Sequence, residues 1–262
     1  MNVSQLSYSE LYGILLSSIV PRPIAWVSTL SAAGQANLAP FSFFNCVSVD
    51  PPLLAFAPGL RVPKDNNSIH GVPKDTLRNV RETKEFVVNV VTYGLREPMN
   101  LSSGEYEHTV NEFEIAKVTP QPSQVVRPPG VGESPVSFEC RLHQILDFST
   151  APTSGSLVIG EIVAIHIGDA QLRDGRLDRD SLDLIGRMGG TQVHPHDTPL
   201  RVDSSKDRSP ILKLKSLPLR RSKAHTNAAK IENYPYVRES PGKTPTRLQN
   251  SPRASHADRG EY

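Results

Sequence analysis

The segment PRPIAWVST at Pro21–Thr29, followed by NLAPFSFFN at Asn37–Asn45, decides the fold of this chain of 262 residues. From Ile24 to Leu30 the pattern predicts a strand, whose successive side chains face opposite ways. A short turn containing Gly34 follows, and glycine supplies the left-handed backbone that a tight hairpin needs. Hydroxyls, an amide and aromatic rings interrupt the two strands. We therefore expect the hairpin to contribute to a binding site as well as to the core.

Further strands and short helices are predicted on both sides of this hairpin. Helical patterns lie at 8–19, 74–84 and 94–102. Strand patterns lie at 24–30, 37–49, 53–57, 85–92, 134–148 and 156–167. The segments 61–73 and 104–132 show no such pattern and are expected at the surface. Tight turns without a repeating β–α order favour a mainly β fold, an antiparallel barrel with short helices.

The charges divide the chain into two parts. Residues 1–190 carry 15 Lys and Arg against 20 Asp and Glu, whereas residues 191–262 carry 14 against 7. The second part holds eight prolines, and only Ile211–Leu217 approaches strand alternation. Such a composition buries too little apolar surface to offset about 1–2 kcal/mol of ordering entropy per residue. We expect one domain at 1–190 and a basic, disordered tail at 191–262.

Four polar residues suit the binding of a phosphate group. Ser28 and Thr29 close a strand, and Lys74 and Thr76 stand where a helix begins, whose unpaired amides and dipole favour an anion. Asp75 works against a phosphate and fits the role of N-cap instead. A capped helix and an ordinary strand end explain the same residues equally well, so both interpretations stay open here.

Aromatic residues near this cluster suit a flat ring. Phe41, Phe43 and Phe44, with Trp26 and Ser42 nearby, could line it, although aromatics at strand spacing are usually core. Asn37 and Asn45 are candidate amide partners for a ring edge, and Asn37 suits a turn equally well. Asn89, within an otherwise apolar strand, needs a hydrogen-bond partner in the structure or in a site. A ligand with one flat end and one anionic end fits this set, and flavin mononucleotide (FMN) is such a ligand.

Several other kinds of site are not indicated. The chain has neither the G-x-G-x-x-G motif nor the P-loop motif. His194 and His196 lack further ligands at metal spacing, and no spacing supports a catalytic triad, so we expect neither metal nor catalytic side chain. The basic tail lacks interleaved aromatics, so no nucleic-acid partner is expected. Without a long apolar run we expect no membrane span.

Cys46 and Cys140 lie in apolar runs typical of buried thiols, which indicates a cytoplasmic protein.

Taken together, these blocks resemble the flavin reductase-like family of FMN-binding split-barrel proteins. The resemblance runs from about Tyr8 to Gly190 and depends on several blocks in order rather than on any one. The blocks are Ile19–Thr29, Gly34–Asn45, Asp50–Pro52, Lys74–Asn79, Glu133–Cys140, Ile159–Glu161 and Ile185–Gly190.

The resemblance implies a six-stranded antiparallel Greek-key split barrel that forms a homodimer, with FMN held near the dimer interface. By position it implies that Ser28, Thr29, Lys74 and Thr76 bind the phosphate. It further implies that Asn37, Ala39, Ser42 and Phe43 contact the ring and ribityl chain, and that Arg187 contributes near the site.

The implied function is that of an oxidoreductase. NADH or NADPH would reduce the bound FMN, which would pass electrons to a second flavin or another acceptor, with no side chain acting as acid or base. One departure from the family pattern concerns the end of the domain. Family members usually continue after Gly189-Gly190 with a tyrosine and a final apolar stretch, which Thr191–His196 does not match. The alternative is therefore a flavin-binding protein without turnover, or an inactive copy with a truncated closing element.

Overall fold

The computed structural model describes residues 1–64, 68–178, 181–188 and 211–213. The chain divides into two units, Met1–Leu217 and Pro218–Tyr262. The second unit lies wholly outside the described residues, as does most of the tail that is predicted to be disordered. No helix in the described part is long and apolar enough to cross a membrane.

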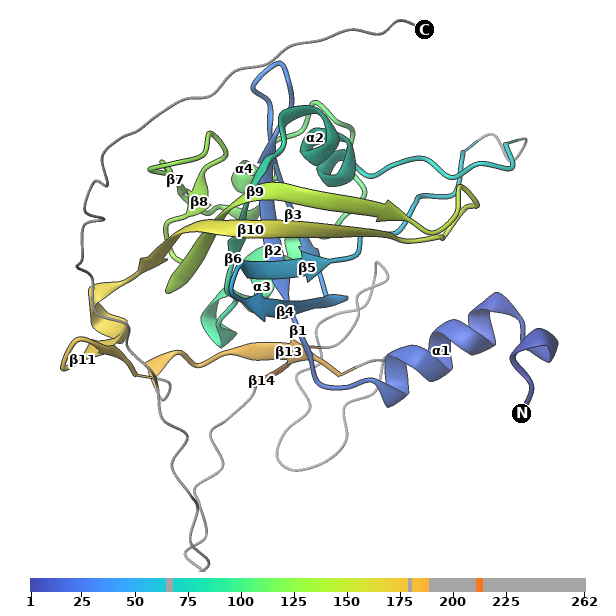
Figure 1. Ribbon diagram of the computed structural model, residues 1–262, viewed down its shortest axis with the longest axis horizontal. Coiled ribbons are helices and arrows are strands. Elements are labelled where there is room, and N and C mark those ends of the chain that lie inside the picture. The colour runs from blue at the N-terminus through green and yellow to red at the C-terminus, as the bar shows by residue number, and fades with distance from the viewer. Residues whose placement is uncertain (65–67, 179–180, 189–210, 214–262) are drawn as a thin grey trace, which may run out of the picture. The chain divides into compact units, whose positions relative to one another are not determined.

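One large antiparallel sheet forms the body of the first unit (Figure 1). Its strand order is β3-β2-β6-β9-β10-β5-β4, and every neighbouring pair is antiparallel. The strands are β2 (Ala25–Leu30), β3 (Ala36–Phe41), β4 (Phe44–Val49), β5 (Pro52–Phe56), β6 (Glu85–Asn89), β9 (Val136–Asp147) and β10 (Ser156–Ile167).

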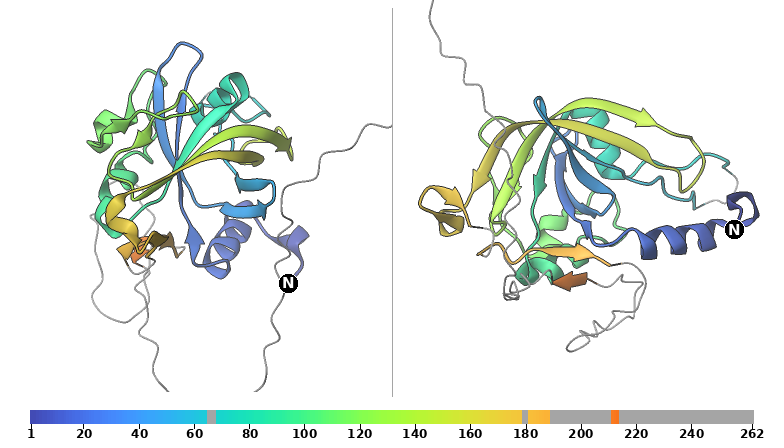
Figure 2. Two further views of the ribbon diagram at one scale, coloured as in Figure 1. Left: turned by 60° about the vertical axis from the view of Figure 1, so that its left-hand side comes forward. Right: turned by 60° about the horizontal axis from the view of Figure 1, so that its bottom comes forward.

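The two edge strands of this sheet, β3 and β4, are consecutive in the chain. Only Ser42 and Phe43 separate them, and each residue spans at most about 3.6 Å of extended chain. The opposite edges must therefore approach each other here, so the sheet curls into a barrel, as Figure 2 shows. The expectation of one strand at 37–49 and of six strands in total is wrong, because the chain changes edges at Ser42 and the sheet has seven strands. The Greek-key order stays a prediction.

Three small sheets accompany the main sheet in the described part of the chain. They are β1 (Arg22–Pro23) with β13 (Ile185–Arg187) and β14 (Ile211–Lys213), β7 (Pro120–Gln121) with β8 (Gly130–Val131), and β11 (Leu172–Arg173) with β12 (Arg176–Leu177). Strand β14 lies beyond residue 190 and pairs with β13, Leu212 opposite Gly186. This strand lies within 211–217, where the sequence approaches strand alternation, and the division into a domain at 1–190 and a disordered tail stays a prediction.

The described residues also form short helices. They are α1 (Tyr8–Ser18), α2 (Asp75–Thr83), α3 (Arg96–Leu101) and α4 (Glu112–Ala116), with 3-10 turns η1 (Val3–Gln5), η2 (Tyr93–Leu95) and η3 (Asp169–Gln171). A capping box between Ser7 and Glu10 starts α1. No side chain of α1 is buried. In Figure 1 the helix projects away from the sheet, and the Arg22 guanidinium donates hydrogen bonds of 2.7 Å to the carbonyls of Leu16 and Ile19 near its end.

The core lies on both sides of strand β2. Trp26 belongs to a cluster with residues of α3 and α4, such as Met99 and Phe113. Ala25 and Val27 belong to a second cluster, which includes Leu77 of α2. The alternation predicted for this strand is thus confirmed, and it explains why both faces of β2 are apolar. Helices α2 and α4 both pack near the hairpin β2–β3, which brings the start of α2 next to β3.

Candidate functional site

A small hollow of about 50 Å³ lies where the first turn of α2 meets β3, α4 and the turn after α3. Its lining residues are Asn37, Ala39, Pro40, Phe41, Arg61, Lys74, Asp75, Thr76, Ser102, Ser103, Gly104, Glu105 and Glu112. Four of the predicted site residues are therefore brought together here: Asn37, Ala39, Lys74 and Thr76. The volume is below the share of about two waters, so the hollow suits one small polar group rather than a ring.

The N-cap of helix α2 lies one residue before the expected cap, Asp75. Lys74 is the N-cap, with an extended backbone and no side-chain capping bond, and Asp75 is the first helical residue. The Asp75 carboxylate instead binds Arg61 Nη2 at 3.1 Å and Arg78 Nη2 at 2.5 Å. The first N–H groups of any α-helix have no partner within the helix. Those of α2 consequently point out of its N-terminus at the hollow with their positive dipole end.

Lys74 places an ammonium group at this N-terminus. In the described part of the chain no carboxylate forms an ion pair with it, and its Nζ lies over the Phe41 ring, 5.9 Å from the ring centroid. Burial lowers the pKa of Lys74, and the charges of Arg61 and Arg187 lower it further, whereas Glu105 raises it. A cation held in surroundings that disfavour its charge is stabilised by a bound anion.

Arg61 carries the clearest sign of a missing partner. Its Nη2 binds Asp75, but its buried Nε has no hydrogen-bond partner among the described residues. Most buried polar atoms in native proteins are hydrogen-bonded, so such an atom needs an explanation. The atom belongs to a side chain that lines the hollow. An oxygen of a bound anion would satisfy it, and the residues present therefore fit a phosphate group.

Thr76 adds a hydroxyl that is free to donate. Its Oγ1 accepts a hydrogen bond of 3.0 Å from Asn37 Nδ2, and both side chains are buried. Because a hydroxyl has one proton and this bond uses a lone pair, the proton remains for another acceptor. No protein acceptor for it is found in the described part. The Thr76 hydroxyl and Arg61 Nε are thus two donors of the lining that have no acceptor in the described part of the protein.

Glu112 is a site residue that the sequence analysis missed. It opens α4 within the segment expected to be a surface excursion, yet only 7% of it is exposed. Its Oε2 accepts a hydrogen bond of 3.2 Å from the Leu38 backbone. Burial raises the pKa of Glu112 to about 7, and Asp75 acts in the same direction while Arg61 opposes it. Below neutral pH, Glu112 therefore adds no negative charge to the hollow.

Ser28 and Thr29 lie outside the lining of the hollow, and both are fully buried. Ser28 Oγ donates to the Pro129 carbonyl at 2.5 Å, and Thr29 Oγ1 accepts from Asn79 Nδ2 at 3.0 Å. Both hydroxyls therefore have protein partners. Asn89 is satisfied within the structure, since it donates to the Trp26 carbonyl at 2.9 Å.

The three remaining predicted residues lie near the crossing from β3 to β4 and on β13. Ser42 Oγ accepts a long bond of 3.5 Å from Arg22 Nε, and the Phe43 side chain is half-exposed. Arg187 faces Arg22 across the β1–β13 ladder. Burial lowers the pKa of Arg187, and the neighbouring Arg22 lowers it further. Its charge also acts on Lys74, so Arg187 contributes to the potential of the hollow without lining it.

The charges around the hollow favour an anion at and below neutral pH. The cations are Arg61, Lys74 and Arg187, and the carboxyl groups are Asp75, Glu105 and Glu112. With Glu112 neutral, the cations outnumber the carboxylates. Nowhere in the described part do three His, Cys, Asp or Glu side chains come together to hold a metal ion. The chemistry that this arrangement supports is anion binding.

Comparison with known proteins places the chain in a family. Residues 16–183 match the model of the flavin reductase like domain. An uncharacterized protein of Aquifex aeolicus (strain VF5) is 39% identical over 189 residues, which cover 72% of this chain and 91% of that protein. The uncharacterized YwrF of Bacillus subtilis (strain 168) is 37% identical over 191 residues, covering 71% and 89%.

Solved structures agree with this match. Nitrilotriacetate monooxygenase component B from Bacillus cereus has a TM-score of 0.69 and 29% identity, covering 83% of this chain and 96% of its own. The Pseudomonas fluorescens 2-nitrobenzoate 2-nitroreductase NbaA has a TM-score of 0.63 and 31% identity, covering 79% and 99%. A protein from Shewanella frigidimarina with a split barrel domain, 22% identical at a TM-score of 0.58 over 75% and 96%, supports the fold alone. The chain belongs to the flavin reductase-like family of split-barrel proteins.

Proposed function

We propose that this protein is an FMN-dependent oxidoreductase that passes reducing equivalents from NADH or NADPH through bound flavin to a second flavin or another acceptor. Membership of the flavin reductase-like family implies flavin binding. Two structural relatives are named as a monooxygenase component and a nitroreductase, which supports redox chemistry of this general kind. The single observation that carries the choice of FMN is the hollow at the start of α2, with its buried, partnerless Arg61 Nε.

The phosphate of FMN would occupy this hollow. Lys74 and Arg61 supply charge, the Thr76 hydroxyl donates, and the first amides of α2 point at the same place. Charge-assisted hydrogen bonds of this kind contribute roughly 1.5–3 kcal/mol each. Asn37 is tied to Thr76 and would then hold the adjoining part of the ligand. Riboflavin lacks the phosphate and would forgo these contacts.

The ring would extend from the hollow along the hairpin. Ala39 also lines the hollow, and Ser42 and Phe43 follow where β3 gives way to β4. We place the ring and ribityl chain against these three residues. The partly exposed Phe43 supplies an aromatic surface. The bound flavin would supply the two-electron chemistry, while the protein orients it and tunes it by hydrogen bonds.

Ser28 and Thr29 keep a proposed role at the phosphate end through their neighbours. Thr29 accepts from Asn79 of α2, whose buried Oδ1 has no partner in the described part. This hydrogen bond fastens β2 to the helix that begins at the hollow. Thr29 would therefore fix the position of α2, whereas Ser28 bonds to Pro129 and Asn89. A direct contact of either residue with the ligand would need its side chain to exchange partners.

The assembly we propose is a homodimer. The 11-residue helix α1 buries no side chain and leaves Tyr12, Ile14 and Leu15 between 41% and 45% exposed. Isolated helices shorter than about 12–15 residues are marginal in water, so α1 needs a packing partner. Val49 of the edge strand β4 is also 85% exposed. Sedimentation equilibrium should give twice the chain mass, and a monomer at all concentrations would contradict the proposal.

We also propose a cytoplasmic location. Both cysteines are free thiols, which suits a reducing compartment. Cys140 is buried as expected, but Cys46 is exposed, because β4 is an edge strand of the sheet. The prediction of two buried thiols is thus correct for Cys140 alone.

A spectroscopic experiment tests the proposed function. The full chain is purified, loaded with FMN and freed of unbound flavin, and its visible spectrum is recorded before and after NADH or NADPH is added without air. We expect flavin bands that bleach with one of the two nucleotides. Bands that never bleach would contradict turnover and would indicate a protein that binds flavin only. Absence of flavin bands after loading would contradict FMN binding itself.

A further inference from the structure

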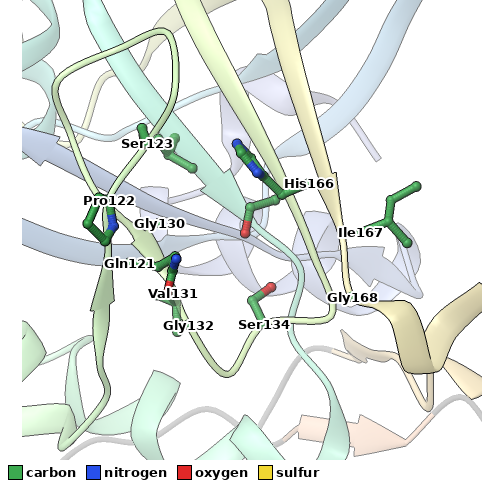
Figure 3. Close-up of a pocket in the computed structure, with 12 residues that line it drawn as sticks. Gln121, Pro122, Ser123, Gly130, Val131, Gly132, Ser134, His166, Ile167 and Gly168 are labelled. Carbon is green, nitrogen blue, oxygen red and sulfur yellow. The ribbon is translucent and has the colours of Figure 1, made fainter.

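A second cavity, larger than the hollow, lies on another part of the domain. It has a volume of about 200 Å³ and is lined by residues from Gln121 to Ser134 and by residues of β6, β9 and the end of β10 (Figure 3). None of its lining residues is shared with the hollow at α2. Val87, Val131 and Ile167 contribute apolar surface. A liquid water occupies about 30 Å³, so the cavity holds a ligand of roughly six non-hydrogen atoms.

Three serine hydroxyls of the lining have already donated their protons. Ser123 Oγ donates to the Pro128 carbonyl at 2.5 Å, and Ser137 Oγ donates to Asn89 Oδ1 at 2.8 Å. Ser134 Oγ is 2.8 Å from the carbonyls of both Val90 and Val136. A serine hydroxyl has a single proton, so what each leaves for a ligand is an acceptor lone pair. The serines thus line the cavity with acceptors.

A buried carboxylate lies next to this wall. Glu139 is fully buried and accepts backbone hydrogen bonds from Gln124, Val125 and Val126 at 2.7–2.9 Å, as well as a short contact from His166 Nε2. Burial acts to raise the pKa of Glu139, but these hydrogen bonds outweigh it and hold the pKa below its usual range. Glu139 is therefore an anion at neutral pH.

His166 connects this carboxylate to the cavity. Its ring lines the cavity, as Figure 3 shows, and its side chain is 36% exposed. Since Nε2 is directed to the Glu139 carboxylate, it carries a proton, and in the neutral form of the ring Nδ1 is one more acceptor. No Lys or Arg side chain lines the cavity. Its electrostatic character is thus opposite to that of the cationic hollow.

We propose that this cavity is a second ligand site, which binds a small organic cation with several N–H donors, of the guanidinium or alkylammonium class. Three serine oxygens and the His166 ring accept its N–H groups, and the Glu139 carboxylate behind His166 balances its charge. The apolar side chains contact the carbon stem. A phosphate or carboxylate is disfavoured, because no lysine or arginine lines the cavity and the buried Glu139 carboxylate repels a like charge.

Titration with methylguanidinium chloride tests this proposal on the full-length protein. The ring resonances of His166 are followed by NMR at constant ionic strength, with inorganic phosphate as the second probe. We expect saturable shifts with a dissociation constant in the millimolar range, as suits so small a ligand, and no saturable response to phosphate. Absence of saturation by methylguanidinium, or saturation by phosphate instead, would overturn the proposal without need of any variant.

Two variants locate the site. His166→Gln keeps a donor for Glu139 but removes the ring, and it should weaken methylguanidinium binding at least about tenfold by calorimetry. The matched control is His143→Gln, an exposed histidine on β9 that does not line the cavity, which should leave binding unchanged. Equal affinity of both variants would place the cation elsewhere and refute the site. Lys74→Ala should bind the cation like the wild type, which separates this outcome from that of the FMN proposal.

Discussion

Asn37 Nδ2 donates a hydrogen bond of 3.0 Å to Thr76 Oγ1, and this bond joins edge strand β3 to the first turn of helix α2. Both side chains are buried, and both line the hollow that we assign to the flavin phosphate. The bond also determines whether Thr76 is a donor or an acceptor toward the ligand. Because its oxygen accepts from Asn37, its hydroxyl proton remains for donation to the ligand.

Thr76→Val should weaken FMN binding by roughly tenfold, because it removes one donor to the phosphate and leaves the Asn37 amide unpaired. Fluorescence titration with FMN measures the change. Thr83→Val is the matched control at the other end of α2, where the Thr83 hydroxyl donates to the Asn79 carbonyl at 2.8 Å. If both variants lose affinity equally, Thr76 acts through helix stability rather than through the ligand.

FMN affinity should fall as the pH rises through about 7, because Glu112, whose pKa burial raises to about 7, then becomes an anion beside the phosphate. We expect a loss of roughly three- to tenfold between pH 6.5 and 8.5. Glu112→Gln should show a weaker dependence over this range, and the variant also controls for ionisation of FMN itself. An unchanged pH profile in Glu112→Gln would exclude Glu112 as its source.

Glu112 should also make the folded state less stable at alkaline pH. Its folded pKa, about 7, exceeds the ordinary value of 4.5, so the unfolded chain releases this proton first. The free energy of unfolding is highest below pH 4.5 as far as this group is concerned, falls between 4.5 and 7, and is level above 7. Urea titrations should show Glu112→Gln gaining roughly 2–4 kcal/mol on the wild type between pH 5 and 8. A difference in unfolding free energy between variant and wild type that does not change with pH would contradict the assignment of this pH dependence to Glu112.

Glu139→Gln should destabilise the protein at neutral pH by roughly 2–4 kcal/mol, because three backbone N–H groups lose a charged acceptor. The folded pKa of Glu139 is lowered, so its stabilisation is present above the ordinary value of 4.5 and is lost as the pH falls through the folded value. The unfolding free energies of variant and wild type should therefore converge in acid. A difference in unfolding free energy that persists in acid would show that the shape of the Glu139 side chain, not its charge, is responsible.

Gly160→Ala should destabilise the fold by roughly 1–3 kcal/mol, because a Cβ at this position of β10 would collide with the buried Phe86 ring. The control is Gly13→Ala in α1, where a Cβ meets no atom within 4 Å. That change should be neutral or stabilising, since alanine favours a helix interior by about 1 kcal/mol. Thermal unfolding of both variants measures the contrast, and equal melting temperatures would argue against the packing of β10 on β6.

Alternation along single strands was sufficient to predict the body of the fold. Trp26 and Val27 point to opposite sides of β2, as their positions in the sequence indicate. The break at Ser42 could not be found in this way, because Phe41 and Phe44 are both good strand residues and the break is imposed by closure of the sheet. Long-range geometry, not local preference, sets that boundary.

The residues of the candidate site also fall into two groups, those that the sequence pattern could identify and those that it could not. Lys74 and Thr76 were identifiable because a helix start has a local signature and an inherent affinity for anions. Arg61 and Glu112 were not, because both lie in segments without periodicity and reach the hollow only through tertiary packing. The partnerless Nε of Arg61 likewise has no counterpart in the sequence pattern, since it depends on burial.

The central claim is that the phosphate of FMN binds at Lys74, and a comparison of FMN with riboflavin tests it most directly. Dissociation constants of both ligands are measured for the wild type, for Lys74→Ala and for Arg81→Ala, which removes a cation two turns further along α2. We predict that Lys74→Ala weakens FMN by at least about tenfold and riboflavin by less than about twofold, with Arg81→Ala unchanged for both. Equal losses of FMN and riboflavin in Lys74→Ala, or no loss of either, would contradict the account.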